Sequence, residues 1–407
     1  MLMTGTTIAQ AIPLAISPIL TRLYTPEDFG VFALFLSLVA VFTPIGSARY
    51  EQAILLSKNN EDAISVFALG FTILSAVCIV LLLCIVLFHT FIMGFLENSE
   101  LEIWIYCVPV TVFFVGLFNL LNYLNNKKKY YNDMARASVL KSIVLAIVQV
   151  VVGFVQEGAS GLISGQVFSQ FFANIKLAKN IFSRKSFGTM FKKRELLQTA
   201  KEYSDFPRYQ IPQVFLNTMT FNLPVFVFAS FFSALVTGFY SFAIRVVLTP
   251  MMIISTSSAK VYNEKLVELI QKGEDAYRFT LSFLRALSLK VVIMLIVVVI
   301  FAPDIFSFIF GDDWEEVGVY TRLLAPWLFL NVIVSTVAYI PNVLKRQRKV
   351  LNMSAIHFVL TVIAVAAGVF FEDVYLLLVA FMLSNSVVLS YNLYWFLKEL
   401  RSFQALR

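Results

Sequence analysis

The chain has 407 residues, of which 59% are hydrophobic and only 14% are charged. Soluble globular proteins average about 45–50% apolar and about 25% charged residues, so this composition argues against a soluble protein and indicates a membrane protein. The net charge is +7. Because the basic residues lie in short connectors beside apolar runs, orientation in a bilayer and contact with anionic lipids explain that charge better than nucleic-acid binding does.

Apolar segments long enough to cross a bilayer follow one another along the whole chain. A spanning helix needs roughly 20 apolar residues, and no connector is long enough for a separate soluble domain. The sixth and seventh segments are the least apolar, and we expect their polar side chains to face a bundle interior or a wet cavity. We therefore predict an all-α polytopic membrane protein of about 12 transmembrane helices. They cover residues 4–23, 30–49, 63–91, 103–125, 137–156, 159–181, 207–230, 235–258, 287–310, 321–343, 352–371 and 374–397.

The connectors between these helices alternate in charge. The one before the fourth helix carries Glu97, Glu100 and Glu102 and no basic residue, whereas five basic residues follow that helix between Lys127 and Lys141. Basic loops are retained on the cytoplasmic side of a membrane. When the N-terminus is placed inside, all but three of the 32 Lys and Arg residues fall on the inner side. We therefore predict that both termini are cytoplasmic.

The two halves of the chain share a repeated segment. The segments that begin at Gly30 and Gly238 each have an aromatic residue within two positions of the glycine, contain an intramembrane proline, and end in Ala followed by a basic residue. They fall in the second and eighth helices, so both halves have the same orientation. Two parallel six-helix repeats around a central cavity form a known transporter architecture. The predicted parts are an N-terminal lobe (1–181), a basic cytoplasmic connector (182–206), a C-terminal lobe (207–397) and a cytoplasmic tail (398–407).

Short motifs at the starts of both halves resemble a known family. Residues 17–30 read SPILTRLYTPEDFG and residues 47–51 read SARYE. These strings resemble the opening of the polysaccharide-biosynthesis flippases, the Wzx-type members of the multidrug/oligosaccharidyl-lipid/polysaccharide (MOP) exporter superfamily. Residues 206–209, which read FPRY, and the segment 238–250 resemble the start of their second half. The string from Leu20 to Gly30 is the most specific of these motifs.

The resemblance implies a substrate and a setting. The substrate would be an oligosaccharide repeat unit on a polyprenyl (undecaprenyl) diphosphate, turned from the inner to the outer leaflet of the bacterial inner membrane for O-antigen, capsule or exopolysaccharide synthesis. A polysaccharide polymerase and a chain-length regulator are the partners that such a pathway implies. The residues of the chain are compatible with such a substrate. A sugar-diphosphate head cannot cross hydrocarbon unaided, so the protein must supply a polar, cationic path.

Arg245 is the sharpest single indication of function. It lies about nine residues into the eighth predicted helix, roughly 13 Å along it at about 1.5 Å per residue. An Arg near mid-membrane costs at least about 2.5–3.5 kcal/mol on insertion scales. We therefore expect Arg245 to face the central cavity and to bind the diphosphate through its planar guanidinium. The related lipid II flippases also carry an Arg in their eighth helix. The alternative is a structural Arg held by an internal ion pair or hydrogen bonds.

Three further arginines are candidate substrate-binding residues. Arg49 and Arg208 lie at the inner ends of the second and seventh helices, where they would line the cytoplasmic mouth and receive the incoming diphosphate. The alternative is that they are ordinary anchors whose stems extend along lipid. Arg22 lies at an outer end, which basic residues usually avoid. It would either pair with Glu27 or Asp28, or bind the head group on release.

Two other charges invite simpler interpretations. Glu51 could balance Arg49 or take part in ion coupling, but a solvated residue at the membrane interface is the simpler interpretation. Arg322 is the other basic residue at an outer end, and we expect it to pair with Glu315 or Glu316.

The sequence predicts neither a cofactor nor a metal site. Cys78, Cys84 and Cys107 fall inside predicted helices without metal-binding or redox spacing, and His89 and His357 are isolated. No glycine-rich phosphate loop is present, so we do not expect an ATPase. Coupling to protons or sodium stays open, although the sequence offers no acidic residue in mid-helix as a candidate for it.

Two other functions compete with a flippase. A drug or cation exporter of the same superfamily shares the architecture, but cationic substrates favour acidic cavity residues, whereas the buried charge here is Arg245. A polysaccharide polymerase or ligase, an enzyme of the same process, needs long outer loops with basic and catalytic residues. The outer connectors here are short and acidic, so we expect a transporter and no catalytic site.

Overall fold

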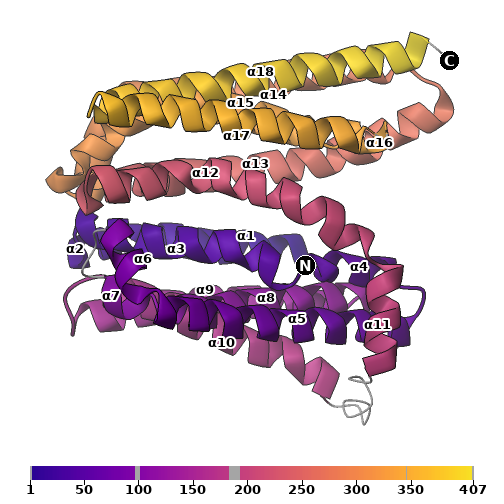
Figure 1. Cartoon of the computed structure of the whole chain (residues 1–407). Coiled ribbons are helices and arrows are strands. Elements are labelled where there is room, and N and C mark those ends of the chain that lie inside the picture. Colours follow the sequence, from indigo (N-terminus) through magenta and orange to yellow (C-terminus); the bar gives the residue numbers. More distant parts are fainter. Residues whose placement is uncertain (1, 97–100, 183–192, 345, 406–407) are drawn as a thin grey trace. The chain divides into compact units, whose positions relative to one another are not determined.

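The computed structural model describes residues 2–96, 101–182, 193–344 and 346–405. Within these ranges the chain is helical and contains no strand (Figure 1). Ten of the described helices are long and apolar enough to cross a membrane. The predicted all-α polytopic fold is therefore confirmed. The cytoplasmic placement of both termini stays a prediction.

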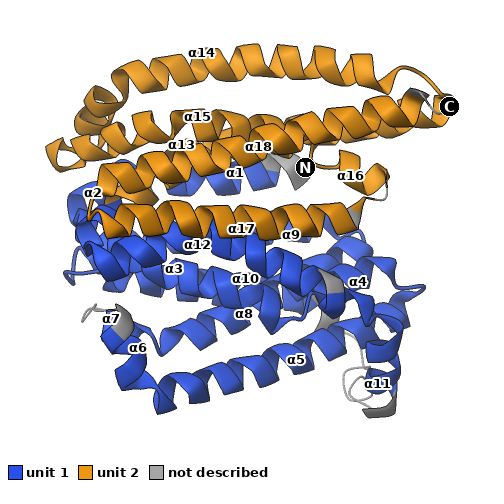
Figure 2. Cartoon of the chain, turned by 45° about the horizontal axis from the view of Figure 1, so that its top comes forward, with its two compact units in different colours: residues 1–238 blue, residues 239–407 orange. Residues whose placement is uncertain are grey.

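The chain divides into two compact units, residues 1–238 and 239–407 (Figure 2). The helices of the first unit are α1 (Leu2–Ala15), α2 (Ser17–Leu23), α3 (Pro26–Gly46), α4 (Tyr50–Leu56), α5 (Asn60–Leu87), α6 (His89–Leu96), α7 (Leu101–Trp104), α8 (Cys107–Lys127), α9 (Tyr131–Gly153), α10 (Ser160–Phe182), α11 (Lys193–Glu202) and α12 (Ile211–Phe231). Helix α13 (Ala234–Lys272) begins in the first unit and continues into the second, which also holds α14 (Ala276–Phe310), α15 (Glu315–Val337), α16 (Ile340–Val343), α17 (Gln347–Phe370) and α18 (Val374–Ala405).

The compact units and the predicted lobes divide the chain at different places. Helix α12 packs against α3, so it belongs to the first unit although it follows the basic connector. The lobe boundaries predicted from the repeat, 1–181 and 207–397, stay a prediction, because residues 183–192 of the connector lie outside the described residues.

Polar side chains tie the helices of the first unit together. Ser142 on α9 donates a hydrogen bond to the carbonyl of Ala9 on α1 (2.6 Å), and Asn174 on α10 donates one to the carbonyl of Phe114 on α8 (2.8 Å). Helix α9 also packs along α10, and α8 packs against α5. Small polar residues are common at helix contacts inside membranes, where water cannot satisfy them. The polar face expected for the sixth predicted helix, α10, is thus turned into the bundle, as Ser169, Gln170 and Asn174 are all buried.

The start of α3 is fixed by its own sequence. Thr25 and Asp28 form a capping box, in which the Thr25 hydroxyl accepts from the Asp28 N–H (3.3 Å) and the Asp28 carboxylate accepts from the Thr25 N–H (2.9 Å). Pro26 occupies the first turn, where its missing N–H costs nothing. Most residues of α3 are buried, so this helix is central to the first unit.

The second unit is held by aromatic and polar contacts. Helix α15 packs against α14 and α18, and α17 runs beside α18 (Figure 1). Phe242 lies in a cluster with Phe306, Phe310 and Trp314. These rings pack the start of α13 onto α14 and its following turn.

The predicted spans agree broadly with the observed helices, but several differ in detail. The predicted spans 63–91 and 321–343 are each broken, at Phe88 and at Ala338–Tyr339. The first predicted helix, 4–23, is broken between α1 and α2, where the Ser17 hydroxyl donates to the Pro13 carbonyl (2.8 Å) and Pro18 lacks an N–H. Helices α13 and α14 extend well beyond the predicted spans 235–258 and 287–310. Hydropathy marks their apolar parts, whereas their charged ends continue the helix outside the membrane.

The repeated glycines have a packing role. A Cβ atom on Gly30 would overlap the carbonyl oxygen of Ala234, and a Cβ atom on Gly238 would overlap the carbonyl oxygen of Pro26. The first turns of α3 and α13 therefore touch backbone to backbone. Each of the two repeat glycines permits the approach of the other repeat's helix, which gives the sequence repeat a physical reason.

We predict that Gly30→Ala and Gly238→Ala each lower the melting temperature of the detergent-solubilised protein. Forcing a methyl group into a close-packed contact typically costs about 1–3 kcal/mol. Gly94→Ala is the matched control, because no atom lies near its added Cβ. Melting of Gly30→Ala at the temperature of Gly94→Ala would contradict the proposed contact.

Candidate functional site

An ion pair between the partly exposed Arg49 and the buried Glu51 forms directly after α3. Ala48 and Arg49 both adopt a left-handed backbone conformation (φ 49° and 62°), which turns the chain sharply into α4. Glu51 is 2% exposed, accepts a hydrogen bond from the Ser47 hydroxyl (2.6 Å), and pairs with the guanidinium of Arg49 (3.0 Å). The interpretation of Glu51 as a solvated interface residue is therefore wrong. Its other predicted role, balancing Arg49, is the one observed.

This ion pair forms part of the wall of a cavity inside the first unit. The cavity has a volume of about 360 Å³. Its apolar wall comes mainly from α3, and its polar wall combines the ion pair with side chains of α8, α9 and α10. The polar and charged lining residues are Thr43, Arg49, Glu51, Asn119, Lys141, Gln166 and Gln170.

Lys141 places a second basic group in this cavity. It lies on α9, ten residues after Tyr131, or roughly 15 Å along the helix at about 1.5 Å per residue. Its ammonium nitrogen lies over the Phe118 ring, 5.1 Å from the centroid. No ion pair to Lys141 occurs within the part of the chain that the structure describes. Helix α9 begins at Tyr131, so Lys141 lies within a spanning helix rather than in the connector itself.

Two polar atoms in the cavity wall have no hydrogen-bond partner among the described residues. They are the side-chain carbonyl oxygen of Gln170, a residue that is 2% exposed, and Nε of Arg49. Buried polar groups are nearly always paired in native proteins. Pro44, which also lines the cavity, has no N–H to donate to the carbonyl of Ala40 one helical turn earlier. The cavity therefore offers both donors and acceptors to a polar ligand.

Arg208, which is predicted to lie at the inner end of the seventh helix, precedes α12. It is exposed and sits in a π-helical turn, Phe206–Gln210, that leads into α12. This turn directly follows a segment that is anchored to the start of α5. The proposed contact of Arg208 with the substrate stays a prediction.

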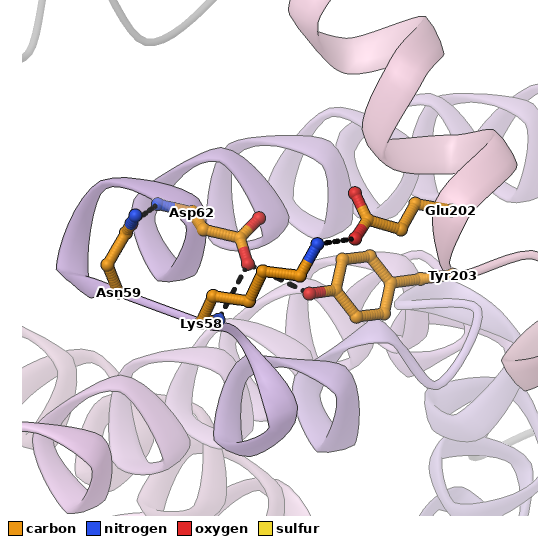
Figure 3. Close-up of polar contacts among 5 residues, drawn as sticks. All are labelled: Lys58, Asn59, Asp62, Glu202 and Tyr203. Carbon is orange, nitrogen blue, oxygen red and sulfur yellow. Dashed lines mark hydrogen bonds and ion pairs between the residues drawn. The ribbon is translucent and has the colours of Figure 1, made fainter.

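The anchor is a polar cluster between α11 and the α4–α5 turn (Figure 3). The Tyr203 hydroxyl donates to the Asp62 carboxylate (2.8 Å), which also accepts from the backbone N–H of Lys58 (2.9 Å). The Lys58 ammonium pairs with Glu202 (2.9 Å). Burial, together with the hydrogen bond to Asp62, raises the pKa of Tyr203 to about 12. The phenol therefore stays protonated and able to donate at physiological pH.

The two arginines predicted to lie at outer ends, Arg22 and Arg322, are not paired as expected. Asp28 is engaged in the capping box, and no ion pair joins Arg22 to Glu27 or Asp28 in the described chain. Arg22 is exposed in the last turn of α2. Arg322 donates to the backbone carbonyls of Val299 and Ile300 (2.7 and 2.6 Å) and pairs with neither predicted glutamate.

Arg245 lies on α13, within the second unit. Its own backbone carbonyl accepts from the Thr249 hydroxyl (2.6 Å), but its guanidinium forms no ion pair or hydrogen bond with another described residue. The alternative of an internally paired structural Arg thus finds no partner in the described parts of the chain. That Arg245 faces a central cavity stays a prediction.

Comparison with known proteins gives a family and a fold. Residues 19–319 match the family model described as "Polysaccharide biosynthesis protein". No curated protein matches the sequence. The structure is similar to a lipid II flippase, MurJ, in an inward closed conformation. The TM-score is 0.76 at 13% identity, and the match covers 97% of this chain and 86% of that one.

Multidrug transporters have a related fold. An inward-facing multidrug resistance transporter of the MATE family matches with a TM-score of 0.63 at 14% identity, covering 98% of this chain and 95% of that one. A MOP-superfamily transporter from Pyrococcus furiosus matches with a TM-score of 0.62 at 14% identity, covering 98% and 94%. At such identities the likeness shows the fold, which is that of the MOP superfamily with its two repeats.

We predict that Glu51→Ala destabilises the protein by about 3 kcal/mol, because removing one partner of a buried ion pair leaves the other charge uncompensated. The exposed Glu61→Ala is the control. Thermal unfolding of Glu51→Ala, Arg49→Ala and the double variant measures the coupling. If the two single losses simply add up in the double variant, the pair contributes nothing.

We predict that Tyr203→Phe lowers the free energy of local opening of α11 by about 1 kcal/mol, the usual contribution of one hydrogen bond. The folded-state pKa of Tyr203 exceeds its unfolded value near 10, so its contribution is complete below about pH 10 and is lost as pH rises through about 12. Amide hydrogen exchange in α11 should therefore be faster in Tyr203→Phe than in wild type by the same factor at pH 7 and pH 9. The exposed Tyr130→Phe should match wild type.

Proposed function

Because the chain belongs to the polysaccharide biosynthesis protein family, we propose that it is a flippase for polyprenyl-diphosphate-linked oligosaccharides. It would move these repeat units from the inner to the outer leaflet by alternating access. The glycan would then enter O-antigen, capsule or exopolysaccharide synthesis. A polymerase and a chain-length regulator would be its functional partners, and the bacterial inner membrane its location, with both termini in the cytoplasm.

The observation that carries this proposal is Arg245, a cation in a spanning helix with no acidic partner among the described residues. Keeping such a charge in hydrocarbon costs several kcal/mol, and intramembrane charges usually mark a substrate path. A guanidinium can hold a diphosphate through two parallel hydrogen bonds. A polyprenyl diphosphate has the complementary charge, and its tail can stay in the bilayer while the head crosses.

The other arginines would serve the two ends of the path. Arg49 and Arg208 would meet the diphosphate at the cytoplasmic mouth, and Arg22 would contact it at release. The fold supports transport rather than an enzyme reaction, since the similar solved structures are transporters and one is named as a lipid II flippase. We propose that no cofactor is bound and that transport is coupled to protons or sodium, if to any ion.

A drug or cation exporter of the same superfamily would share the fold. A cationic substrate requires an acidic site, but Glu51, which is acidic and lines the cavity of the first unit, is already neutralised by Arg49. Lys141 and Arg245, which both lie on spanning helices, have no acidic partner among the described residues, so an anionic substrate fits better.

We predict that Arg245→Ala abolishes transport, whereas Arg245→Lys keeps a small part of it, because a point charge remains without the planar fork. The measurement is translocation of a fluorescent lipid-linked oligosaccharide in proteoliposomes, together with surface glycan in cells. Arg278→Ala is the control, because Arg278 is exposed and pairs only with the neighbouring Asp275 among the described residues. Wild-type transport by Arg245→Ala would remove Arg245 from the mechanism.

A further inference from the structure

The cavity of the first unit carries one uncompensated positive charge. Arg49 and Glu51 form an ion pair and cancel each other. Lys141 has no acidic partner among the described residues, and its ammonium group contacts the face of Phe118. An unpaired lysine on a spanning helix is energetically costly and usually faces a polar cavity or a ligand. A single negative charge is therefore the ligand charge that this cavity complements.

The remaining polar wall suits hydroxyl groups. Asn119, Gln166 and Gln170 each bring an amide, which both donates and accepts hydrogen bonds. The Gln170 side-chain carbonyl oxygen has no hydrogen-bond partner among the described residues. A bare inorganic anion would use the lysine but leave this acceptor unpaired. A ligand with several hydroxyl groups would satisfy both.

The size of the cavity limits the ligand further. Small-molecule sites usually measure about 300–1,000 Å³, so about 360 Å³ is at the lower end of that range. The space is large enough for one monosaccharide ring.

We infer that this cavity binds one acidic sugar of the transported glycan, with the sugar carboxylate on Lys141 and the ring hydroxyls on Asn119, Gln166 and Gln170. The inference rests on the proposed function and adds a substrate class to it, namely glycans that contain a uronic acid or a related acidic sugar. The head group of an anionic phospholipid also combines one negative charge with hydroxyl groups. Three amides around one lysine favour the ring, which carries more hydroxyl groups.

A binding experiment tests the ligand class with the full-length protein in detergent. Calorimetric titration with glucuronate, glucose and sn-glycerol 3-phosphate compares an acidic sugar, its neutral counterpart and a lipid head group. We expect glucuronate to bind at least about tenfold more tightly than either of the others, since hydrogen bonds to charged groups are stronger than those between neutral groups. Equal binding of glucose, or tighter binding of glycerol phosphate, would overturn the assignment.

Variants test the role of Lys141. Lys141→Gln should weaken glucuronate binding at least about tenfold, and Lys141→Arg should retain most of it because the charge remains. Lys179→Gln is the matched control on α10, where the lysine is exposed. Unchanged glucuronate affinity in Lys141→Gln would overturn the inference. If that variant does not fold, Lys141→Arg is compared with Gln170→Leu, which removes an amide of the cavity. Because Lys141→Arg keeps the positive charge, an equal loss of glucuronate affinity in both variants would also overturn the inference.

A transport experiment separates this inference from the proposed function. Proteoliposomes are loaded with two lipid-linked oligosaccharides that differ in one sugar, glucuronic acid or glucose. We expect wild type and Lys179→Gln to prefer the acidic substrate, and Lys141→Gln to lose that preference. Transport of both at equal rates by all three proteins would refute the acidic-sugar site and leave the flippase standing. Transport of neither would refute the flippase itself.

Discussion

Hydrocarbon offers no water to a buried polar group, so every charge in this protein's spanning region must find its partner within the protein or in a ligand. The pair formed by Arg49 and Glu51 shows the first solution. Glu51 is held by Ser47 as well as Arg49, and the left-handed turn at Ala48 and Arg49 brings the three side chains together. Once these charges are paired, they stabilise the end of α3 and add no net charge to the cavity. Lys141, which has no acidic partner among the described residues, represents the second solution.

The helices that line this cavity are closely packed within the first unit. Helix α3 begins at a capping box and is buried along most of its length. Its start is held against the first turn of α13 by Gly30 and Gly238, whose backbones approach too closely for any side chain. The α9 and α10 helices that carry Lys141 and Gln170 pack along each other. A cavity between packed helices keeps its shape, which favours selection of a ligand by size as well as by charge.

Much of the fold could be predicted from the sequence, because a spanning helix is an apolar run of fixed minimum length. The site was harder to predict, since hydropathy averages over many residues. Lys141 looks like part of the basic connector after Lys129, although it already lies inside the predicted helix 137–156. The pairing of Glu51 depends on two residues with positive φ in a stretch without glycine, Ala48 and Arg49, and no sequence pattern marks such a turn.

Arg245 and Lys141 suit two different groups of the proposed substrate. A guanidinium is a bidentate donor suited to the two phosphates that every polyprenyl-diphosphate substrate carries. An ammonium is a compact point charge suited to a single carboxylate. In this view Arg245 would recognise what all substrates share, and Lys141, among amides in a cavity of about 360 Å³, would recognise what distinguishes one glycan from another. Specificity would then come chiefly from the cost of leaving Lys141 unpaired when a neutral sugar occupies the cavity.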